Sequence, residues 1–266
     1  MQNIFWTRAA RVLGGVAAAL TIGGCAGIGG DHRAGLDVES ILNAIAQDDV
    51  ASVQSAVNRG VISVNQKLPA PAYTAGAPLV ALAARDGSIQ VLRYLIAAGA
   101  DLNARTSVNE TALMLAAYFG GGDDGYTSSD RHDAAVHLLV EAGASLENVP
   151  NNYTPLAYAA YNNRQRALHY LLERGARVDA DASERMAYVN TPLMMAALQG
   201  HRDVVRMLLR AGADPLIRVR GGHTAREFAS KYRQSHVEPL LACAESLPPG
   251  VRFAQYCEGA SVAATR

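Results

Sequence analysis

The sequence predicts an all-α fold, a solenoid of about five to six stacked helix-turn-helix units joined by hairpin loops. The first observation is that four stretches nearly repeat one another: VLRYLIAAGAD ending at Asp101, AVHLLVEAGAS ending at Ser145, ALHYLLERGAR ending at Arg177 and VVRMLLRAGAD ending at Asp214. The second is a pair of alanines upstream of each stretch. Each unit has an apolar face on both sides that it cannot bury alone, so neighbouring copies must stack.

The clearest unit, residues 191–214, shows how each copy forms two helices. Thr191 supplies an N-cap hydroxyl, and Pro192 suits the first helical position, where its missing N–H is not needed. Gly200 ends this helix because glycine adopts the left-handed conformation readily. A second helix follows, with apolar residues at i, i+3 and i+4 from Val205, and Gly212 closes it.

This pattern resembles the ankyrin repeat, whose signature is T-P-L-H-x-A in a unit of about 33 residues. The resemblance covers residues 38–242. Residues 154–156 and 191–193 match the T-P-L opening, residues 111–113 lack the proline, and the copy at 78–84 lacks the threonine. The family's histidine is replaced by Ala81, Met114, Ala157 and Met194. The resemblance therefore implies the loss of one side-chain hydrogen bond per repeat.

Two insertions and two degenerate ends interrupt the array. One insertion, GGDDGYTSSDR at 121–131, is predicted between the two helices of the third unit, and the other lengthens the loop at 178–190. Upstream, residues 42–65 read as a degenerate first repeat with Asp49 in place of the turn glycine. Downstream, Arg226 and Ser230 replace apolar residues, which gives the last repeat the polar outer face that a terminal repeat needs.

The first thirty residues are typical of a secretory signal. Arg8 and Arg11 are the only charges before Asp31, and an apolar run begins at Val12. The end of this run, TIGGC, resembles a bacterial lipoprotein signal. That resemblance implies a signal peptide at 1–24, acylation of Cys25 and a flexible linker at 25–37. The alternative is a plain transmembrane anchor, although the run barely reaches the roughly 20 apolar residues of a span.

The same resemblance implies a location and a partner class. Ala26 stands where an inner-membrane retention signal usually has aspartate, so we expect a lipid-anchored protein on the periplasmic side of a bacterial outer membrane rather than the inner membrane. The chain has 24 basic and 24 acidic side chains, and loss of residues 1–24, with two arginines and no acid, leaves a net charge of −2. The sequence contains no basic patch that would indicate a nucleic-acid partner.

Cys243 and Cys257 are the remaining cysteines, and an oxidising compartment favours their pairing. The resulting loop would contribute roughly 3 kcal/mol in the chain-entropy model and pin the tail, residues 243–266, to the last repeat. The alternative is two unpaired thiols in a frayed tail.

The sequence contains no recognisable catalytic, metal or cofactor motif, so we expect no enzyme and no cofactor. His137 and His169 occupy equivalent positions of successive repeats and are interpreted as repeat-surface residues. The acidic segment 123–130 has oxygen ligands at short spacing, but it lacks the register and distal glutamate of a calcium loop. A solvated loop is therefore the favoured interpretation over a calcium site.

A protein-binding surface is expected on the concave side. In the ankyrin family, partners usually contact the loop tips and the two residues after the alanine pair. Tyrosine offers a rigid contact area with a polar tip, which suits binding surfaces. The candidate binding residues are Arg85, Tyr118, Phe119, Tyr126, Tyr153, Tyr161, Glu184, Arg185 and Tyr188. The alternative is that Tyr118 and Tyr161 only cover the groove between repeats.

The sequence thus predicts a membrane-tethered module that binds another protein of the cell envelope as a scaffold, an inhibitor or an immunity-type protein. The alternative is an enzyme accessory or ligand-binding protein that uses the insertion at 121–132.

Overall fold

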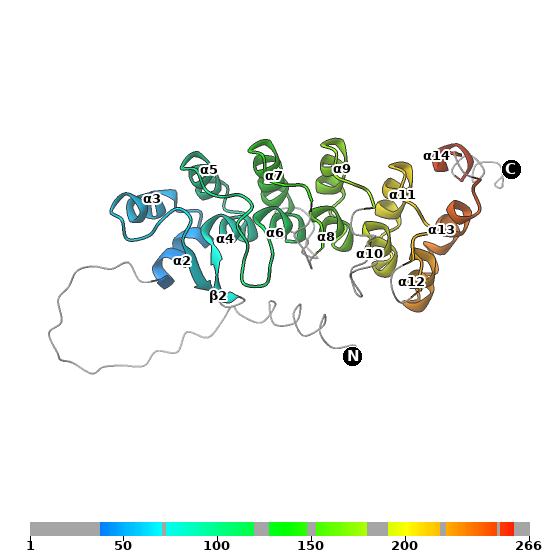
Figure 1. The fold of residues 1–266 in the computed structure, drawn as a ribbon, viewed down its shortest axis with the longest axis horizontal. Helices are drawn as coiled ribbons and strands as arrows, with labels where there is room; N and C mark the ends of the chain where they lie inside the picture. Colours follow the sequence, from blue (N-terminus) through cyan, green and yellow to red (C-terminus); the bar gives the residue numbers. More distant parts are fainter. Residues whose placement is uncertain are drawn as a thin grey trace.

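Helix pairs stacked side by side form an elongated array in the computed structural model (Figure 1), which describes residues 38–70, 73–119, 128–147, 153–179, 191–218, 222–248 and 251–257. One row consists of the inner helices α2 (Val38–Ala46), α4 (Leu79–Asp86), α6 (Ala112–Tyr118), α8 (Pro155–Tyr161), α10 (Pro192–Gln199) and α12 (Ala225–Lys231). The other consists of the outer helices α3 (Val50–Asn58), α5 (Ile89–Ala97), α7 (Ser128–Glu141), α9 (Gln165–Glu173), α11 (Arg202–Arg210) and α13 (Glu238–Glu245). The six pairs in the described part confirm the predicted all-α solenoid.

Close contact between successive inner helices depends on the alanine pairs. The pairs at 83–84, 116–117, 159–160 and 196–197 are completely buried. A methyl side chain lets two helix backbones approach, so the inner helices contact their neighbours more extensively than the outer helices do. The inner row is accordingly the more tightly spaced row in Figure 1, and the array curves toward it.

Threonine caps begin four of the inner helices. The hydroxyls of Thr111, Thr154, Thr191 and Thr224 each accept a hydrogen bond from the backbone N–H three residues later. Met114, which replaces the family's histidine, is fully buried, and its sulfur lies 3.4 Å from the backbone nitrogen of Thr111. Part of the polar contact expected from the histidine is thus provided by a thioether.

The turn between inner and outer helix requires a positive φ, which glycine provides in two repeats and other residues provide in three. Gly87 and Gly200 have φ values of 67° and 76°, while Asp48, Asn163 and Arg233 have values of 56°, 56° and 60°. The turn residue of the first repeat is therefore Asp48, and the assignment of Asp49 to this position was wrong by one residue. Asp49 instead caps α3, because its carboxylate accepts from the N–H of Ser52.

Helix α7 is longer than the other outer helices. It has 14 residues, whereas α3, α5, α9 and α11 have nine each. Residues 128–131, the end of the insertion expected at 121–131, form its first turn, so this part of the insertion extends the helix. Residues 120–127 lie outside the described part of the chain.

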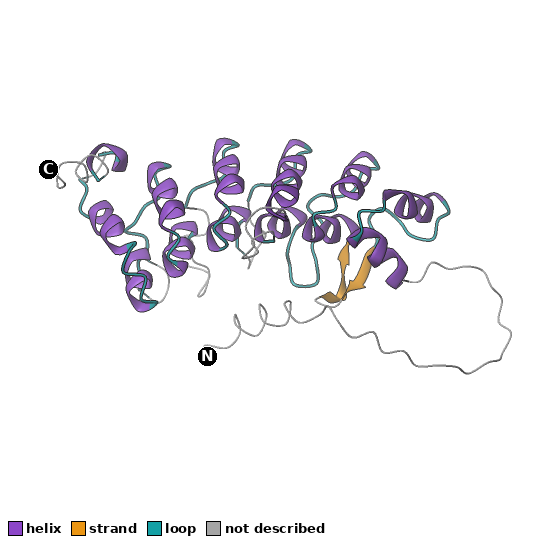
Figure 2. Ribbon diagram, turned by 180° about the vertical axis from the view of Figure 1, so that it is seen from behind, coloured by secondary structure: helices purple, strands orange, loops and turns teal. Residues whose placement is uncertain are grey.

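The first hairpin loop contains the strands of the described chain, β1 (Lys67–Ala70) and β2 (Tyr73–Pro78), which pair in antiparallel register with Leu68 opposite Ala77 (Figure 2). Strand β2 runs directly into α4, whose N-cap Pro78 makes no side-chain capping bond. In this repeat a strand pair, rather than a threonine cap, precedes the inner helix.

The C-terminal repeat extends beyond its predicted end. Helix α13 runs to Glu245, so the repeat does not stop at 242 and Cys243 belongs to a helix rather than to the tail. A short helix, α14 (Phe253–Tyr256), packs back on α11. Arg226 and Ser230 are exposed on α12, as expected for a terminal repeat, and the preceding loop exposes 59% of Leu216. Within the described residues, no helix has the length and apolar character needed to span a bilayer.

Candidate functional site

An aromatic cluster lies where α6 and α8 pack against each other on the inner row. Tyr118 and Phe119 come from the end of α6, Tyr158 and Tyr161 from α8, and Tyr153 precedes α8. We call these five residues the aromatic cluster. The Tyr118 ring is edge-on to Phe119 and Tyr158, with centroid distances of 5.1 and 5.4 Å, and nearly parallel to Tyr161 at 6.5 Å.

Exposure differs within the aromatic cluster. Tyr118, Phe119, Tyr158 and Tyr161 are half-buried, so each keeps some accessible surface, and Tyr158 is the most deeply placed of the three tyrosines. Tyr153 is only 6% exposed and packs edge-on against Tyr158 at 5.8 Å. The expectation that Tyr153 contacts a partner directly is therefore wrong, because Tyr153 is buried. Tyr118 and Tyr161 cover the space between two repeats and are also accessible, so the two interpretations of these residues are compatible.

Tyr158 is a member of the aromatic cluster that sequence reasoning missed. It occupies the repeat position held by Leu82, Leu115 and Met195, which are buried residues. Its position therefore indicated core packing rather than surface. The signal that could have revealed it is its spacing from Tyr161, since residues three apart share one face of a helix.

The three half-buried tyrosines have raised pKa values, mainly because burial disfavours the phenolate. Burial raises the pKa of Tyr158 well above 10, and the Glu110 carboxylate raises it further. Burial also raises the pKa of Tyr118, to which Tyr161 and Glu110 add, and that of Tyr161, where a hydrogen bond with Gln199 acts in the opposite direction. All three hydroxyls are therefore protonated at neutral pH and can donate hydrogen bonds.

A buried ion pair contacts the backbone at the end of α6, next to the aromatic cluster. The Arg164 guanidinium lies 2.5 Å from an Asp133 carboxylate oxygen and also donates to the backbone carbonyl of Phe119. Arg164 is only 5% exposed. The Asn162 side chain donates to the Tyr118 carbonyl at 2.9 Å. The end of α6 is thus fixed by two side chains from the next repeat, which makes the aromatic rings a pre-formed surface.

The remaining candidate residues do not join the aromatic cluster. The Arg85 guanidinium forms a paired contact with Asp86, at 2.6 and 2.9 Å, at the end of α4. Tyr126, Glu184, Arg185 and Tyr188 lie outside the described residues, as does Cys25. His137 stacks on Tyr170 at a centroid distance of 3.6 Å across the outer helices, which agrees with a repeat-surface role.

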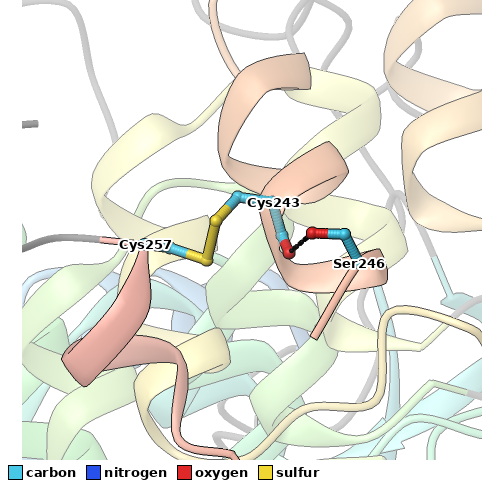
Figure 3. The surroundings of a disulfide bond; sticks show 3 residues. All are labelled: Cys243, Ser246 and Cys257. Atoms are coloured by element: carbon cyan, nitrogen blue, oxygen red, sulfur yellow. Dashed lines mark hydrogen bonds between the residues drawn. A yellow bond between two sulfur atoms is a disulfide. The ribbon is translucent and has the colours of Figure 1, made fainter. Parts of the chain in front are cut away.

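A disulfide joins Cys243 in α13 to Cys257, immediately after α14 (Figure 3). The two Cα atoms are 5.9 Å apart. The Ser246 hydroxyl donates to the Cys243 carbonyl at 2.7 Å and completes the end of α13. The bridge and the packing of Phe253, which is 6% exposed, attach the tail to the last two repeats.

The described residues form no second candidate site, either in a cavity or in a group of metal ligands. A cavity of about 520 Å³ at the last repeat is lined by charged groups that bond to one another, with Arg218 on Glu227 and Arg226 on Glu245. Among the described residues, no three histidine, cysteine or acidic side chains form a group that could hold a metal ion. The site that the structure does define is a partly exposed aromatic surface on a repeat scaffold.

A family model of ankyrin repeats in three copies matches residues 81–182 and 125–219. The match spans more than half of the chain, which therefore belongs to the ankyrin repeat family. Ankyrin repeats generally mediate binding between proteins, and the fold is typically not catalytic.

Several known proteins share this similarity over part of their length. The chain is 30% identical to the mitochondrial disaggregase of Bos taurus over 261 residues, 91% of this chain and 36% of the relative. It is 38% identical to a putative ankyrin repeat-containing protein of Treponema pallidum, over 42% of this chain and 36% of the relative. It is 47% identical to the palmitoyltransferase Hip14 of Drosophila melanogaster, over 32% of this chain and 13% of the relative. The chain thus spans little more than a third of these relatives at most.

Proposed function

We propose that this protein is a binding module that holds another protein against its inner face, with the aromatic cluster at the centre of the contact. The observation that carries the proposal is the clustering of four half-buried aromatic residues at the junction of α6 and α8. Half-buried tyrosines are common anchors of protein interfaces because they bury a large area and lose little side-chain entropy. A scaffold, an inhibitor and an immunity-type protein would all use this surface.

We further propose that the module works in the bacterial cell envelope, attached by lipid on Cys25. The TIGGC sequence at 21–25 supports acylation, and Ala26 supports the outer membrane as the destination. The disulfide between Cys243 and Cys257 agrees with an oxidising compartment, where such bonds persist.

Capture of partners from solubilised membranes tests the binding surface. Wild-type protein is compared with Tyr118→Ala/Tyr161→Ala, and Tyr256→Ala serves as the control, because Tyr256 is 66% exposed on α14 far from the aromatic cluster. We expect the double variant to lose a protein that wild type and the control both retain. Thermal unfolding monitored by circular dichroism verifies that the double variant is folded. An unchanged partner list from a folded double variant would rule out the aromatic cluster as the contact.

Labelling with a radioactive or clickable fatty acid tests the anchor. Wild type should incorporate the label and fractionate with outer membranes, and Cys25→Ser should do neither. Incorporation of lipid by Cys25→Ser would contradict the assignment of the acylation site.

The alternative function rests on the insertion at 121–132. Of its residues the structure describes the helical end, where the His132 imidazole donates to the Arg85 carbonyl at 2.8 Å. This bond joins two repeats and is structural. Deletion of residues 121–127 should therefore leave binding through the aromatic cluster intact.

A further inference from the structure

One position of the repeat forms a line of side chains along the inner row, from the aromatic cluster to the last repeat. Seven residues after the N-cap threonine of each helix stand Tyr118 in α6, Tyr161 in α8, Leu198 in α10 and Lys231 in α12. We call these four residues the inner strip. Each of these helices packs against the next, so the inner strip is continuous, and it changes from aromatic to aliphatic to cationic.

Tyr232 extends the aromatic character of the inner face to α12. It is 46% exposed and stacks on Phe228 of the same helix at a centroid distance of 6.5 Å. Burial is the main cause of the raised pKa of Tyr161, and nearby Tyr232 adds to it. The accessible inner face therefore does not end at the aromatic cluster but reaches the last repeat.

Lys231 and Arg233 place two positive charges at this end of the inner strip. Both are exposed, and within the described ranges neither forms an ion pair. Glu227 stands one helical turn before Lys231, but its carboxylate accepts from Arg218 at 3.0 Å and from the Thr224 N–H at 2.9 Å. The described part of the chain thus leaves both cations to be matched by an acidic group from outside.

The length of the inner strip sets the size of the segment that can cover it. Packed helices lie about 8–10 Å apart, and three such intervals separate α6 from α12, so the strip is roughly 24–30 Å long. An extended chain rises about 3.3 Å per residue, so about eight residues span it. Opposite charges across an interface guide association and fix its orientation. An occupant that complements the strip therefore has its acidic residues at one end.

We propose that the inner strip binds an extended segment of the partner protein that is apolar at one end and acidic at the other. The apolar side chains pack on Tyr118, Tyr161 and Leu198, and the carboxylates lie against Lys231 and Arg233. This inference rests on the proposed function and names the chemistry and the direction of its contact.

The test is a selection from a random dodecapeptide library displayed on phage, against the full chain purified in detergent. We expect the enriched peptides to carry apolar residues at one end and aspartate or glutamate at the other. The same selection on Lys231→Glu/Arg233→Glu should replace these acids by lysine or arginine. The control Arg93→Glu/Arg252→Glu makes the same change in net charge at two exposed positions outside the inner strip, and should select acidic peptides as the wild type does.

Three outcomes of the selection would overturn the proposal. They are enriched peptides without an acidic end, the same enriched peptides from the charge-reversed variant, and no enrichment above background.

Affinity measurements then locate the acidic end of the peptide. The most enriched peptide is labelled with fluorescein, and its binding is followed by fluorescence anisotropy. Lys231→Gln/Arg233→Gln should weaken binding about three- to tenfold, because two exposed ion pairs are lost. Added salt should weaken binding to wild type more than binding to this variant. Equal affinities of the two proteins, or equally tight binding of a dodecapeptide of alternating serine and glutamate, would contradict the proposal.

Failure of this inference is distinguishable from failure of the proposed function. If Tyr118→Ala/Tyr161→Ala loses the captured partner while Lys231→Glu/Arg233→Glu retains it, the binding surface stands and the partner has no acidic end at α12. If the captured proteins are unchanged in the tyrosine double variant, the proposed function itself falls.

Discussion

The Asn103 side-chain oxygen accepts a hydrogen bond of 2.9 Å from the backbone N–H of Ser145, 42 residues further along the chain. Equivalent bonds join three other pairs of successive hairpin loops. Asn65 accepts from Asp101 at 2.8 Å, Glu147 from Arg177 at 3.2 Å and Asp179 from Asp214 at 3.2 Å. We call these four bonds the hairpin ladder. They connect each hairpin loop to the next, at the end of the repeat opposite the turn.

Removing one bond of the hairpin ladder should weaken the array measurably. Asn103→Ala leaves the Ser145 N–H without its acceptor and is expected to cost about 1 kcal/mol. Urea unfolding followed by circular dichroism measures the change. Asn58→Ala, at an exposed position at the end of α3, is the control and should stay within about 0.5 kcal/mol of wild type. Equal effects of both substitutions would argue against a stabilising ladder.

Asp179→Asn should stabilise the protein at neutral pH. Burial and the nearby Asp214 carboxylate raise the pKa of Asp179, although the bond from the Asp214 N–H lowers it. Because the folded pKa exceeds the unfolded one, stability from this group is greatest at low pH and is lost as pH rises through the folded pKa. Asparagine keeps the acceptor without the charge, as Asn65 and Asn103 do.

We expect Asp179→Asn to gain about 0.5 to 1 kcal/mol at pH 7 and little at pH 3. Thermal melts at both values measure this difference. Asp203→Asn, at a side chain 61% exposed, is the control and should gain nothing. Destabilisation of Asp179→Asn at pH 7 would show that its charge contributes favourably.

His201 should make the array sensitive to mild acid. Burial lowers the pKa of His201 and His236 lowers it further, against the effect of the 2.9 Å bond to the Tyr161 carbonyl. The unfolded chain therefore takes up the proton first, and stability falls as pH drops below the ordinary value of about 6.5.

The difference in melting temperature between pH 7.5 and 5.5 should be smaller in His201→Gln, which keeps a donor for the Tyr161 carbonyl. His169→Gln, at a side chain 63% exposed, should retain the wild-type difference. If His201→Gln shows the same acid sensitivity as wild type, another group is responsible.

Arg164→Ala should be strongly destabilising, by about 3 to 5 kcal/mol, because it leaves the Asp133 carboxylate buried without its counter-ion. Denaturant unfolding measures the loss. Arg93→Ala at an exposed position of α5 is the control. The double variant Asp133→Ala/Arg164→Met should recover part of the loss, because no charge is left buried; a loss equal to the sum of the single changes would contradict coupling of the pair.

The disulfide should protect the tail rather than the whole array. Each repeat contacts mainly its neighbours, so Cys243→Ser/Cys257→Ser is expected to free α14 while the central repeats remain folded. Trypsin should then cleave at Arg252 earlier than in the wild type, as followed by mass spectrometry. If the central repeats of this variant unfold at the same denaturant concentration as its tail, the bridge supports all repeats.

The sequence was sufficient for the repeats and their helices but not for the contacts between repeats. Thr191, Pro192 and Gly200 determine α10 locally, so its bounds follow from neighbouring residues alone. Asp48 was missed as a turn residue because a non-glycine at positive φ needs compensation from elsewhere. Here its carboxylate accepts from the N–H groups of Gln90 and Val91 in the next repeat.

The aromatic cluster was predictable only in part, because some of its contacts also form between repeats. Tyr118, Phe119 and Tyr161 stand at positions that the repeat leaves free, and the structure does place them together. Tyr153, expected at the surface, is buried, and Tyr158, which was missed, is half-buried, because burial depends on the neighbouring repeat. Neither the Arg164 to Asp133 pair nor the approach of Glu110 to Tyr158 has a signal at short spacing, since their partners are 31 and 48 residues apart.

The exposed Leu216 marks the end of the hairpin ladder but not of the array, because the repeat formed by α12 and α13 follows it. It occupies the position that Asn103, Glu147 and Asp179 hold in earlier repeats, four residues after the helix-ending glycine, and it has no side-chain acceptor to offer. If a repeat were inserted after residue 218, the backbone N–H of its own hairpin loop would face Leu216 and would have no side-chain acceptor there. A duplicated repeat inserted there would therefore gain a ladder bond only if Leu216 were also replaced by a residue with a side-chain acceptor.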